Sequence, residues 1–235
     1  MIPIWDTQGG ASRAVVTWAF LGICVAVAIA QACANDLVAT QRVLRFGVTP
    51  AWVFEGVPFD QGPASFPYVW TLVTNIVFHA GWLHLVGNVV YLVVFGPRLE
   101  SYWGAWGQAW FLGLVGTASS WAQVSAMPTS TAVVIGASGA ISGLLGAYVV
   151  RFPATRLTVL VPGYGVRVWP AWGLVGCWVA LQIGEWGLQR WAGETGVGVY
   201  AHIGGFLMGF AVMSWRMWRE SVVPVGVTPP QQGRT

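Results

Sequence analysis

Residues 136–148 read GASGAISGLLGAY, and small side chains recur through this stretch at the spacing of one helix face. Further along, residues 201–209 read AHIGGFLMG, where His202, Gly205 and Gly209 fall at positions i, i+3 and i+7. Small residues let the backbones of two membrane helices approach closely. The two stretches therefore predict a pair of helices in close contact. The small residues of the first stretch are Gly139, Ser142, Gly143 and Gly146.

The composition around these stretches is that of a membrane protein. Of the 235 residues, 56% are hydrophobic and only 8% are charged, and the mean hydropathy is +0.64. A soluble domain usually carries about 25% charged residues, and a third of that share cannot cover a water-facing surface. Soluble enzymes, nucleic-acid binders and disordered chains are thereby excluded. The three cysteines show neither paired spacing nor a histidine at ligand spacing, so we expect no metal and no cofactor.

Apolar runs of about 20 residues, the length that crosses a bilayer, recur six times. They predict an all-α polytopic membrane protein. The stretch 35–68 is rich in Pro, which opposes a spanning helix, and in aromatic residues, which oppose a solvated linker. We therefore expect a loop that lies half in the membrane interface. The expected spans are about 14–34, 79–96, 106–126, 132–151, 168–188 and 198–216.

The placement of Arg predicts the orientation of these spans. All eleven basic residues are Arg, and a cytoplasmic N-terminus puts eight of them on the cytoplasmic side and three outside. Cytoplasmic loops collect basic residues, so both termini are expected in the cytoplasm. The resulting division is a short cytoplasmic segment at 1–13, a six-span domain at 14–219 and a disordered cytoplasmic tail at 220–235.

Four polar side chains stand out within the expected spans, where such groups are costly and are usually functional. They are His84, Asn88, Ser138 and His202. At 1.5 Å per residue, all four lie roughly 6–14 Å below the outer boundary, although they come from three different helices. If the small-residue surfaces meet, Ser138 and His202 come within hydrogen-bond reach, which is the nucleophile–base arrangement of covalent catalysis.

Each of these residues also has a purely structural interpretation. A lone serine in a membrane helix usually bonds to its own backbone, and a lone histidine often serves as a structural hydrogen-bond partner. His84 and Asn88 are four residues apart on one helix face, so they could also form hydrogen bonds that only hold two helices together. Their shared depth favours the functional interpretation, because three independent structural coincidences would otherwise be needed.

Together these residues resemble the rhomboid family of intramembrane serine proteases. The resemblance covers about 70–220 in the family's order and spacing, and the motifs are highly specific in combination. The matching stretches are HAGWLHLVGN at 79–88, FGPRLESYWG at 95–104, GASGAISGLLGAY at 136–148 and AHIGGFLMG at 201–209.

The resemblance implies a six-transmembrane-helix rhomboid-like bundle in which 35–78 forms a partly membrane-embedded first loop. It implies that Ser138 is the nucleophile and His202 the general base of a dyad without an acidic member. Asn88 and His84 match the family's oxyanion-binding positions. The implied substrates are transmembrane proteins, cleaved near the outer face of a bacterial cytoplasmic membrane, toward which the active site opens.

Two positions depart from the family pattern. Trp70 is followed by Thr71 where the family often has Trp-Arg, so an Arg anchor of the first loop is missing. Ser142 stands four residues after the expected nucleophile, where an aromatic ring often packs on the catalytic histidine. Either another side chain takes the place of that support, or His202 is held more loosely.

Two other functions remain open from the sequence. A proteolytically inactive rhomboid-like binder or chaperone of membrane helices would keep its binding after loss of Ser138, whereas a protease would lose its activity. A transporter or channel is disfavoured because the chain shows no internal repeat and no acidic residue near the depth of the four polar side chains.

Overall fold

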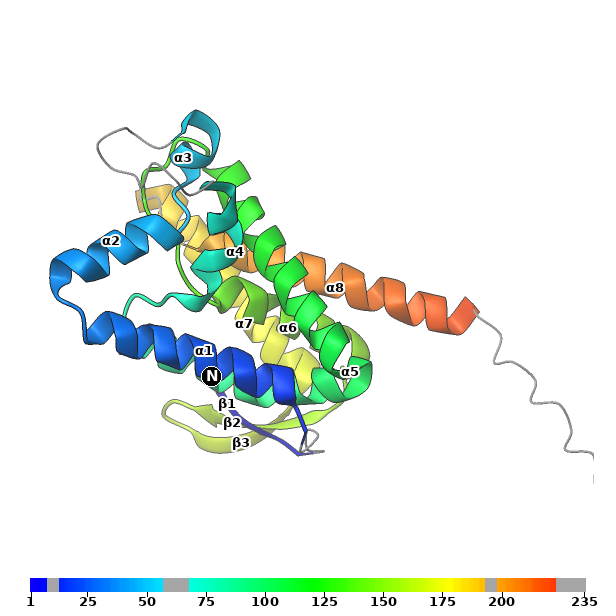
Figure 1. The fold of residues 1–235 in the computed structure, drawn as a ribbon. Coiled ribbons are helices and arrows are strands. Elements are labelled where there is room, and N and C mark those ends of the chain that lie inside the picture. The colour runs from blue at the N-terminus through cyan, green and yellow to red at the C-terminus, as the bar shows by residue number, and fades with distance from the viewer. Residues whose placement is uncertain (8–12, 57–67, 193–197, 223–235) are drawn as a thin grey trace, which may run out of the picture.

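The computed structural model describes residues 1–7, 13–56, 68–192 and 198–222, and most of them are helical (Figure 1). The helices are α1 Val15–Ala32, α2 Asp36–Phe46, α3 Pro50–Glu55, α4 Thr71–Thr74, α5 Trp82–Ala126, α6 Ser138–Arg151, α7 Ala171–Ala192 and α8 Val199–Val222. Single 3₁₀ turns at Tyr68–Trp70 and Asn75–Val77 flank α4. The strands are β1 Ile2–Asp6, β2 Arg156–Val161 and β3 Gly165–Pro170.

Helix α5 consists of two helices joined at Gly104. This residue has φ 80° and ψ 170°, a left-handed conformation that glycine adopts without strain, so the helix breaks and changes direction there (Figure 1). Each half has about 22 residues and is about 33 Å long. The halves correspond to the expected spans 79–96 and 106–126. The first half starts three residues late because Gly81, at φ 133°, precedes it.

Helix α6 lies at the centre of the molecule, and its residues from Gly139 to Tyr148 are buried. It packs against α8 through glycine, as the small-residue pattern predicts. A Cβ atom built on Gly205 would overlap the carbonyl oxygen of Gly139, and one on Gly209 would overlap that of Gly143. The two helices therefore touch backbone to backbone, which brings their first turns together.

The three strands form an antiparallel sheet in the order β1-β2-β3, which the sequence analysis did not predict. An all-α fold is therefore correct for the bundle but incomplete for the chain. Leu157 and Val159 of β2 are fully buried, while their neighbours in the strand are more exposed, as expected of a strand packed on one face. Ile2 of β1 pairs with Leu160 across more than 150 residues of chain, a contact that no local pattern signals.

The stretch 35–68 contains no spanning helix in its described part. Helices α2 and α3 have 11 and six residues, too short to cross a bilayer. Tyr68 is bonded to the connection between α2 and α3. Its hydroxyl accepts a hydrogen bond from the Thr49 N–H (2.6 Å) and donates one to the Gly47 carbonyl (3.2 Å). Burial raises the pKa of the Tyr68 phenol, so the donor persists at neutral pH. Residues 57–67 lie outside the described part.

Thr71, which replaces the expected Arg, belongs to the same anchor. It is fully buried, and its hydroxyl donates to the Tyr68 carbonyl at 2.6 Å. A hydrogen-bonded Tyr–Thr pair thus holds the end of the first loop without a charge.

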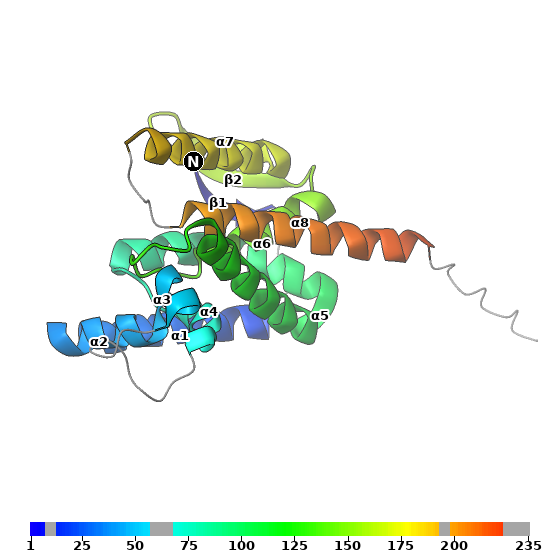
Figure 2. The same cartoon turned by 90° about the horizontal axis from the view of Figure 1, so that it is seen from above.

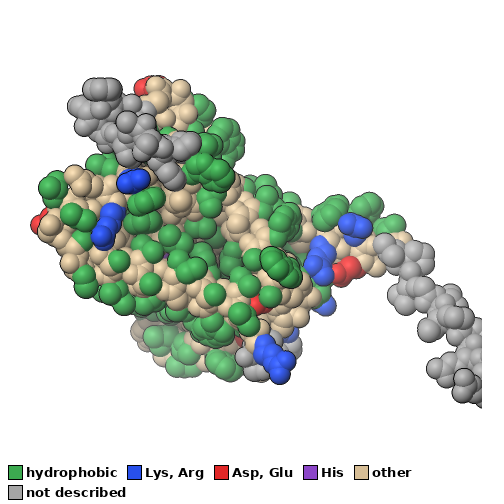
Figure 3. Space-filling model, viewed as in Figure 1, with side chains coloured by type: hydrophobic (Ala, Val, Ile, Leu, Met, Phe, Trp, Pro, Cys, Tyr) green, Lys and Arg blue, Asp and Glu red, His purple; other side chains and the backbone are tan. Residues whose placement is uncertain are grey.

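Among the described residues, α1 and α5 are long and apolar enough to cross a membrane by length and composition. Hydrophobic side chains cover much of the surface in Figure 3, and the charged ones are few. Large apolar side chains such as Leu83 and Trp106 are 88% and 91% exposed, as expected of a surface that contacts lipid. Helix α8 runs to Val222, three residues beyond the expected end of the domain, and residues 223–235 of the expected tail lie outside the described part.

Candidate active site

Ser138 is the first residue of α6 and is half-buried. The chain turns into the helix at Gly136, which has φ 135° and whose N–H donates to the Asn75 carbonyl at 3.0 Å. A Cβ atom at this position would lie 2.7 Å from Cε1 of His84, so glycine is required for space as well as for conformation. Helix geometry leaves the first N–H groups of α6 without partners inside the helix, and they carry its positive end.

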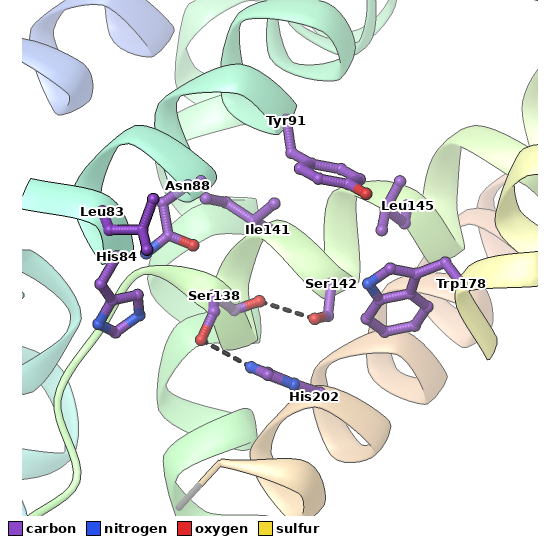
Figure 4. Close-up of a pocket in the computed structure, with 11 residues that line it drawn as sticks. Leu83, His84, Asn88, Tyr91, Ser138, Ile141, Ser142, Leu145, Trp178 and His202 are labelled. Atoms are coloured by element: carbon purple, nitrogen blue, oxygen red, sulfur yellow. Dashed lines mark hydrogen bonds between the residues drawn. The ribbon is translucent and has the colours of Figure 1, made fainter. Parts of the chain in front are cut away.

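His202 is the fourth residue of α8 and reaches Ser138 directly. Its Nε2 atom lies 2.8 Å from the Ser138 hydroxyl oxygen (Figure 4). The start of α8 is held by α5, because the side-chain amide oxygen of the buried Gln123 accepts a hydrogen bond from the Ala201 N–H at 3.1 Å. The contact between serine and histidine that the glycine pattern predicts is therefore present in the structure.

His84 and Asn88 lie on the first half of α5 and face the same site. The Nδ1 atom of His84 accepts a hydrogen bond from the Ala80 N–H at 3.4 Å, which leaves Nε2 as the protonated, donating nitrogen of a neutral ring. The Nδ2 group of Asn88 is buried and has no hydrogen-bond partner among the residues that the structure describes. An unpaired buried donor is costly, so this amide has capacity for a ligand.

A cavity of about 260 Å³ joins the four residues. It lies between α5, α6, α7 and α8, and Figure 4 shows Ser138 with His84 on one side and His202 on the other. Most of its other walls are apolar. The lining residues are Leu83, His84, Gly87, Asn88, Tyr91, Ser138, Ile141, Ser142, Leu145, Trp178 and His202.

Ser142, which occupies the expected aromatic position, is buried and bonds within its own helix. Its hydroxyl donates to the Ser138 carbonyl at 2.7 Å. An aromatic ring reaches the histidine from α7 instead: the centroid of Trp178 lies 6.4 Å from that of His202 and 5.7 Å from that of Phe206, on which it stacks. The support for His202 thus comes from a different helix.

Gln182 on α7 also contacts the histidine, and the sequence analysis missed it. Its carboxamide nitrogen lies 2.8 Å from Nδ1 of His202, and the residue is only 6% exposed. Trp178 and Gln182 are four residues apart, so they share one face of α7. The available signal was an amide side chain within the otherwise apolar run 178–184.

Comparison with known proteins agrees with this architecture. The family model described as the rhomboid domain matches residues 67–219, which include α4 to most of α8 and all four site residues. The chain belongs to the rhomboid family, whose members are membrane proteins.

Several curated relatives are similar to this chain. RHOMBOID-like protein 6, mitochondrial, of Arabidopsis thaliana is 32% identical over 148 residues, which are 61% of this chain and 42% of the relative. Rhomboid-like protease 5 of Toxoplasma gondii is 32% identical over 159 residues, 60% of this chain and 16% of the relative. RHOMBOID-like protein 7 of Arabidopsis thaliana is 29% identical over 172 residues, which are 69% of this chain and 50% of the relative. The chain thus spans half or less of each of these relatives.

Proposed function

We propose that this protein is an intramembrane serine endopeptidase, with Ser138 as nucleophile and His202 as general base. The observation that carries the proposal is the 2.8 Å contact between the Ser138 hydroxyl and Nε2 of His202. This is the hydrogen-bond distance that proton transfer requires, and it occurs beside a cavity and at a helix N-terminus. A serine engaged only in structural bonding would face its own backbone, as Ser142 does.

In the proposed reaction, Oγ of Ser138 bonds to the scissile carbonyl carbon while its proton moves to Nε2 of His202. The tetrahedral intermediate collapses as Nε2–H protonates the leaving amine nitrogen, and an ester remains on Ser138. Water then gives a proton to Nε2 and attacks the ester carbon. Oγ leaves and takes the proton back, so the dyad is restored.

The oxyanion of that intermediate needs donors that are already in place. The proposed donors are Nε2–H of His84, the amide of Asn88 and the backbone N–H of Ser138. The Nδ2 of Asn88, which has no partner within the described part of the chain, and the hydrogen bond that fixes the ring of His84 support this assignment. Each such donor typically contributes about 10²–10³ in rate.

We further propose six membrane spans within a catalytic domain at 14–219, with segment 1–13 and tail 220–235 in the cytoplasm. The two halves of α5 supply two spans of about 33 Å each. Strand β1 pairs with β2, which starts just after α6, so the N-terminus and that connection share one side. Ser138 lies at the opposite end of α6, about 20 Å away, and would open toward the outer face of a bacterial cytoplasmic membrane.

The proposed substrates are transmembrane proteins whose segments unwind readily near the outer face, since a stable helix hides its backbone. The test is incubation of purified protein in bilayers with a single-span substrate. Wild type and the matched variant Ser101→Ala, an exposed serine near the end of the first half of α5, should cleave it, and Ser138→Ala should not. Cleavage by Ser138→Ala would overturn the assignment, and binding without cleavage by wild type would favour a helix-binding role.

A further inference from the structure

We propose that Gln182 is a positioning residue that holds His202 in the tautomer able to accept a proton from Ser138. This inference deepens the proposed function and rests on it. It would make the site a triad with an uncharged third member, supplied by α7, which lies at the edge of the molecule away from α1 and α2 (Figure 2).

The geometry fixes the imidazole ring from both ends. Nδ1 lies 2.8 Å from the carboxamide of Gln182, and Nε2 lies 2.8 Å from the hydroxyl of Ser138. These two side chains are the hydrogen-bond partners of the ring within the described part of the chain. Trp178, one turn before Gln182, lies beside the ring, so α7 contacts His202 through both a polar and an aromatic group.

The chemistry requires a hydrogen-bond acceptor at Nδ1. A neutral imidazole carries one proton, and Nε2 can act as a base toward Ser138 only when that proton is on Nδ1. When Nε2 takes the serine proton, both nitrogens carry hydrogen, and the Nδ1–H of the cation again needs an acceptor. The carboxamide of Gln182 lies within hydrogen-bond reach of Nδ1, and its oxygen would meet this need in both states once it faces the ring.

The carboxamide offers either a donor or an acceptor to the ring. The structure turns its nitrogen toward Nδ1, which corresponds to the opposite tautomer, and a half-turn of the terminal amide presents the oxygen instead. The reactive form is the one with the oxygen facing Nδ1. A neutral acceptor suits this depth, because an ionised carboxylate within a membrane span is costly.

Two substitutions separate positioning from simple helix packing. Gln182→Glu keeps an acceptor oxygen, whereas Gln182→Met keeps the length and removes every hydrogen-bonding group. We expect kcat to fall about 10- to 100-fold in Gln182→Met with KM nearly unchanged, and to stay within about tenfold of wild type in Gln182→Glu, because a wrong tautomer lowers kcat rather than substrate binding. Gln189→Met, two turns further along α7 at a half-buried position where the amide bonds to Glu185 and not to His202, is the matched control and should retain wild-type rates.

The decisive measurement is ¹⁵N NMR of the histidine rings in full-length protein carrying Ser138→Ala, with His202 assigned by its loss in His202→Asn. The proton of His202 should reside on Nδ1 with Gln182 or Gln182→Glu, and shift to Nε2 or to a mixture in Gln182→Met. An unchanged tautomer in Gln182→Met, or a Gln182→Glu variant as slow as Gln182→Met, would overturn the proposal.

Two features of the experiment separate the positioning role from misfolding of a variant and from a failure of the proposed proteolysis. Gln182→Leu provides a second variant without an acceptor, and only variants with near-wild-type thermal unfolding are compared. The NMR measurement needs no proteolysis, so its outcome is distinct from a failure of wild type to cleave substrate.

Discussion

Gly205 of α8 and Gly139 of α6 touch backbone to backbone: a Cβ atom on Gly205 would overlap the Gly139 carbonyl oxygen. Gly139 follows Ser138 directly, and Gly205 lies three residues after His202. This contact therefore fixes the separation of the two helices at the level where the serine and histidine meet, and the 2.8 Å hydrogen bond depends on it.

The first prediction is that Gly205→Ala destabilises the protein and disrupts the site. The added methyl group must push α8 away from α6, and overpacking of this kind costs about 1–3 kcal/mol. Thermal unfolding and substrate cleavage should both decline. In Gly113→Ala the same substitution meets no atom within 4 Å, so that variant should be neutral or slightly more stable. Equal stability of the two variants would contradict the close contact.

A second prediction concerns Glu100, a buried carboxylate at the far end of the first half of α5. It accepts hydrogen bonds from the N–H groups of Val16 and Thr17 and from the Thr17 hydroxyl, at 2.7–2.9 Å. It thereby anchors the first turn of α1. Glu100→Gln replaces one acceptor oxygen by a donor and should lower the free energy of unfolding by about 1–3 kcal/mol. Glu55→Gln, at an exposed position, is the control, and a similarly small effect of both substitutions would show that the anchor contributes little.

A third prediction concerns the proposed oxyanion donors. Asn88→Ala and His84→Ala should each lower kcat by about 10²–10³, while the thermal unfolding temperature changes little. Substrate titrations should place the loss in kcat rather than in KM, because an oxyanion exists only after attack. Full activity of the double variant would mean that the pair serves only to join helices.

Much of this site could be predicted from the sequence, because its determinants are local. Helix periodicity and glycine spacing bring the first turns of α6 and α8 together, and four polar residues at one depth mark the cavity. Gly104 and Gly81 also act locally, through φ values that only glycine adopts readily. The family resemblance rests on the same short motifs, and the rhomboid-domain match covers them.

The features that were missed depend on contacts distant in sequence. Strand β1 is five residues long, and its partner begins 150 residues later. Gln182 and Trp178 contact His202 only because of how α7 lies against α8, which no spacing within α7 reveals. The replacement of the expected loop Arg by the Tyr68–Thr71 pair likewise depends on the folded loop.

A fourth prediction tests the proposed topology. Reporter fusions after Arg156 and after Arg219 should be cytoplasmic, and one after Gln189 should be external, because Arg is concentrated on the cytoplasmic side. An external reporter after Arg156 would also separate β2 from a cytoplasmic N-terminus, contrary to their pairing in one sheet.

The most direct test of the proposed function is covalent labelling of the nucleophile by a fluorophosphonate or an isocoumarin, mapped by mass spectrometry. The Ser138 hydroxyl has Nε2 of His202, the proposed base, at 2.8 Å, whereas the hydroxyl of Ser142, one turn further on, is bonded to a backbone carbonyl. We expect the label on Ser138, its loss in Ser138→Ala, a steep fall in His202→Ala and full labelling of Ser101→Ala. Labelling that survives Ser138→Ala and moves to Ser142 would contradict the assignment.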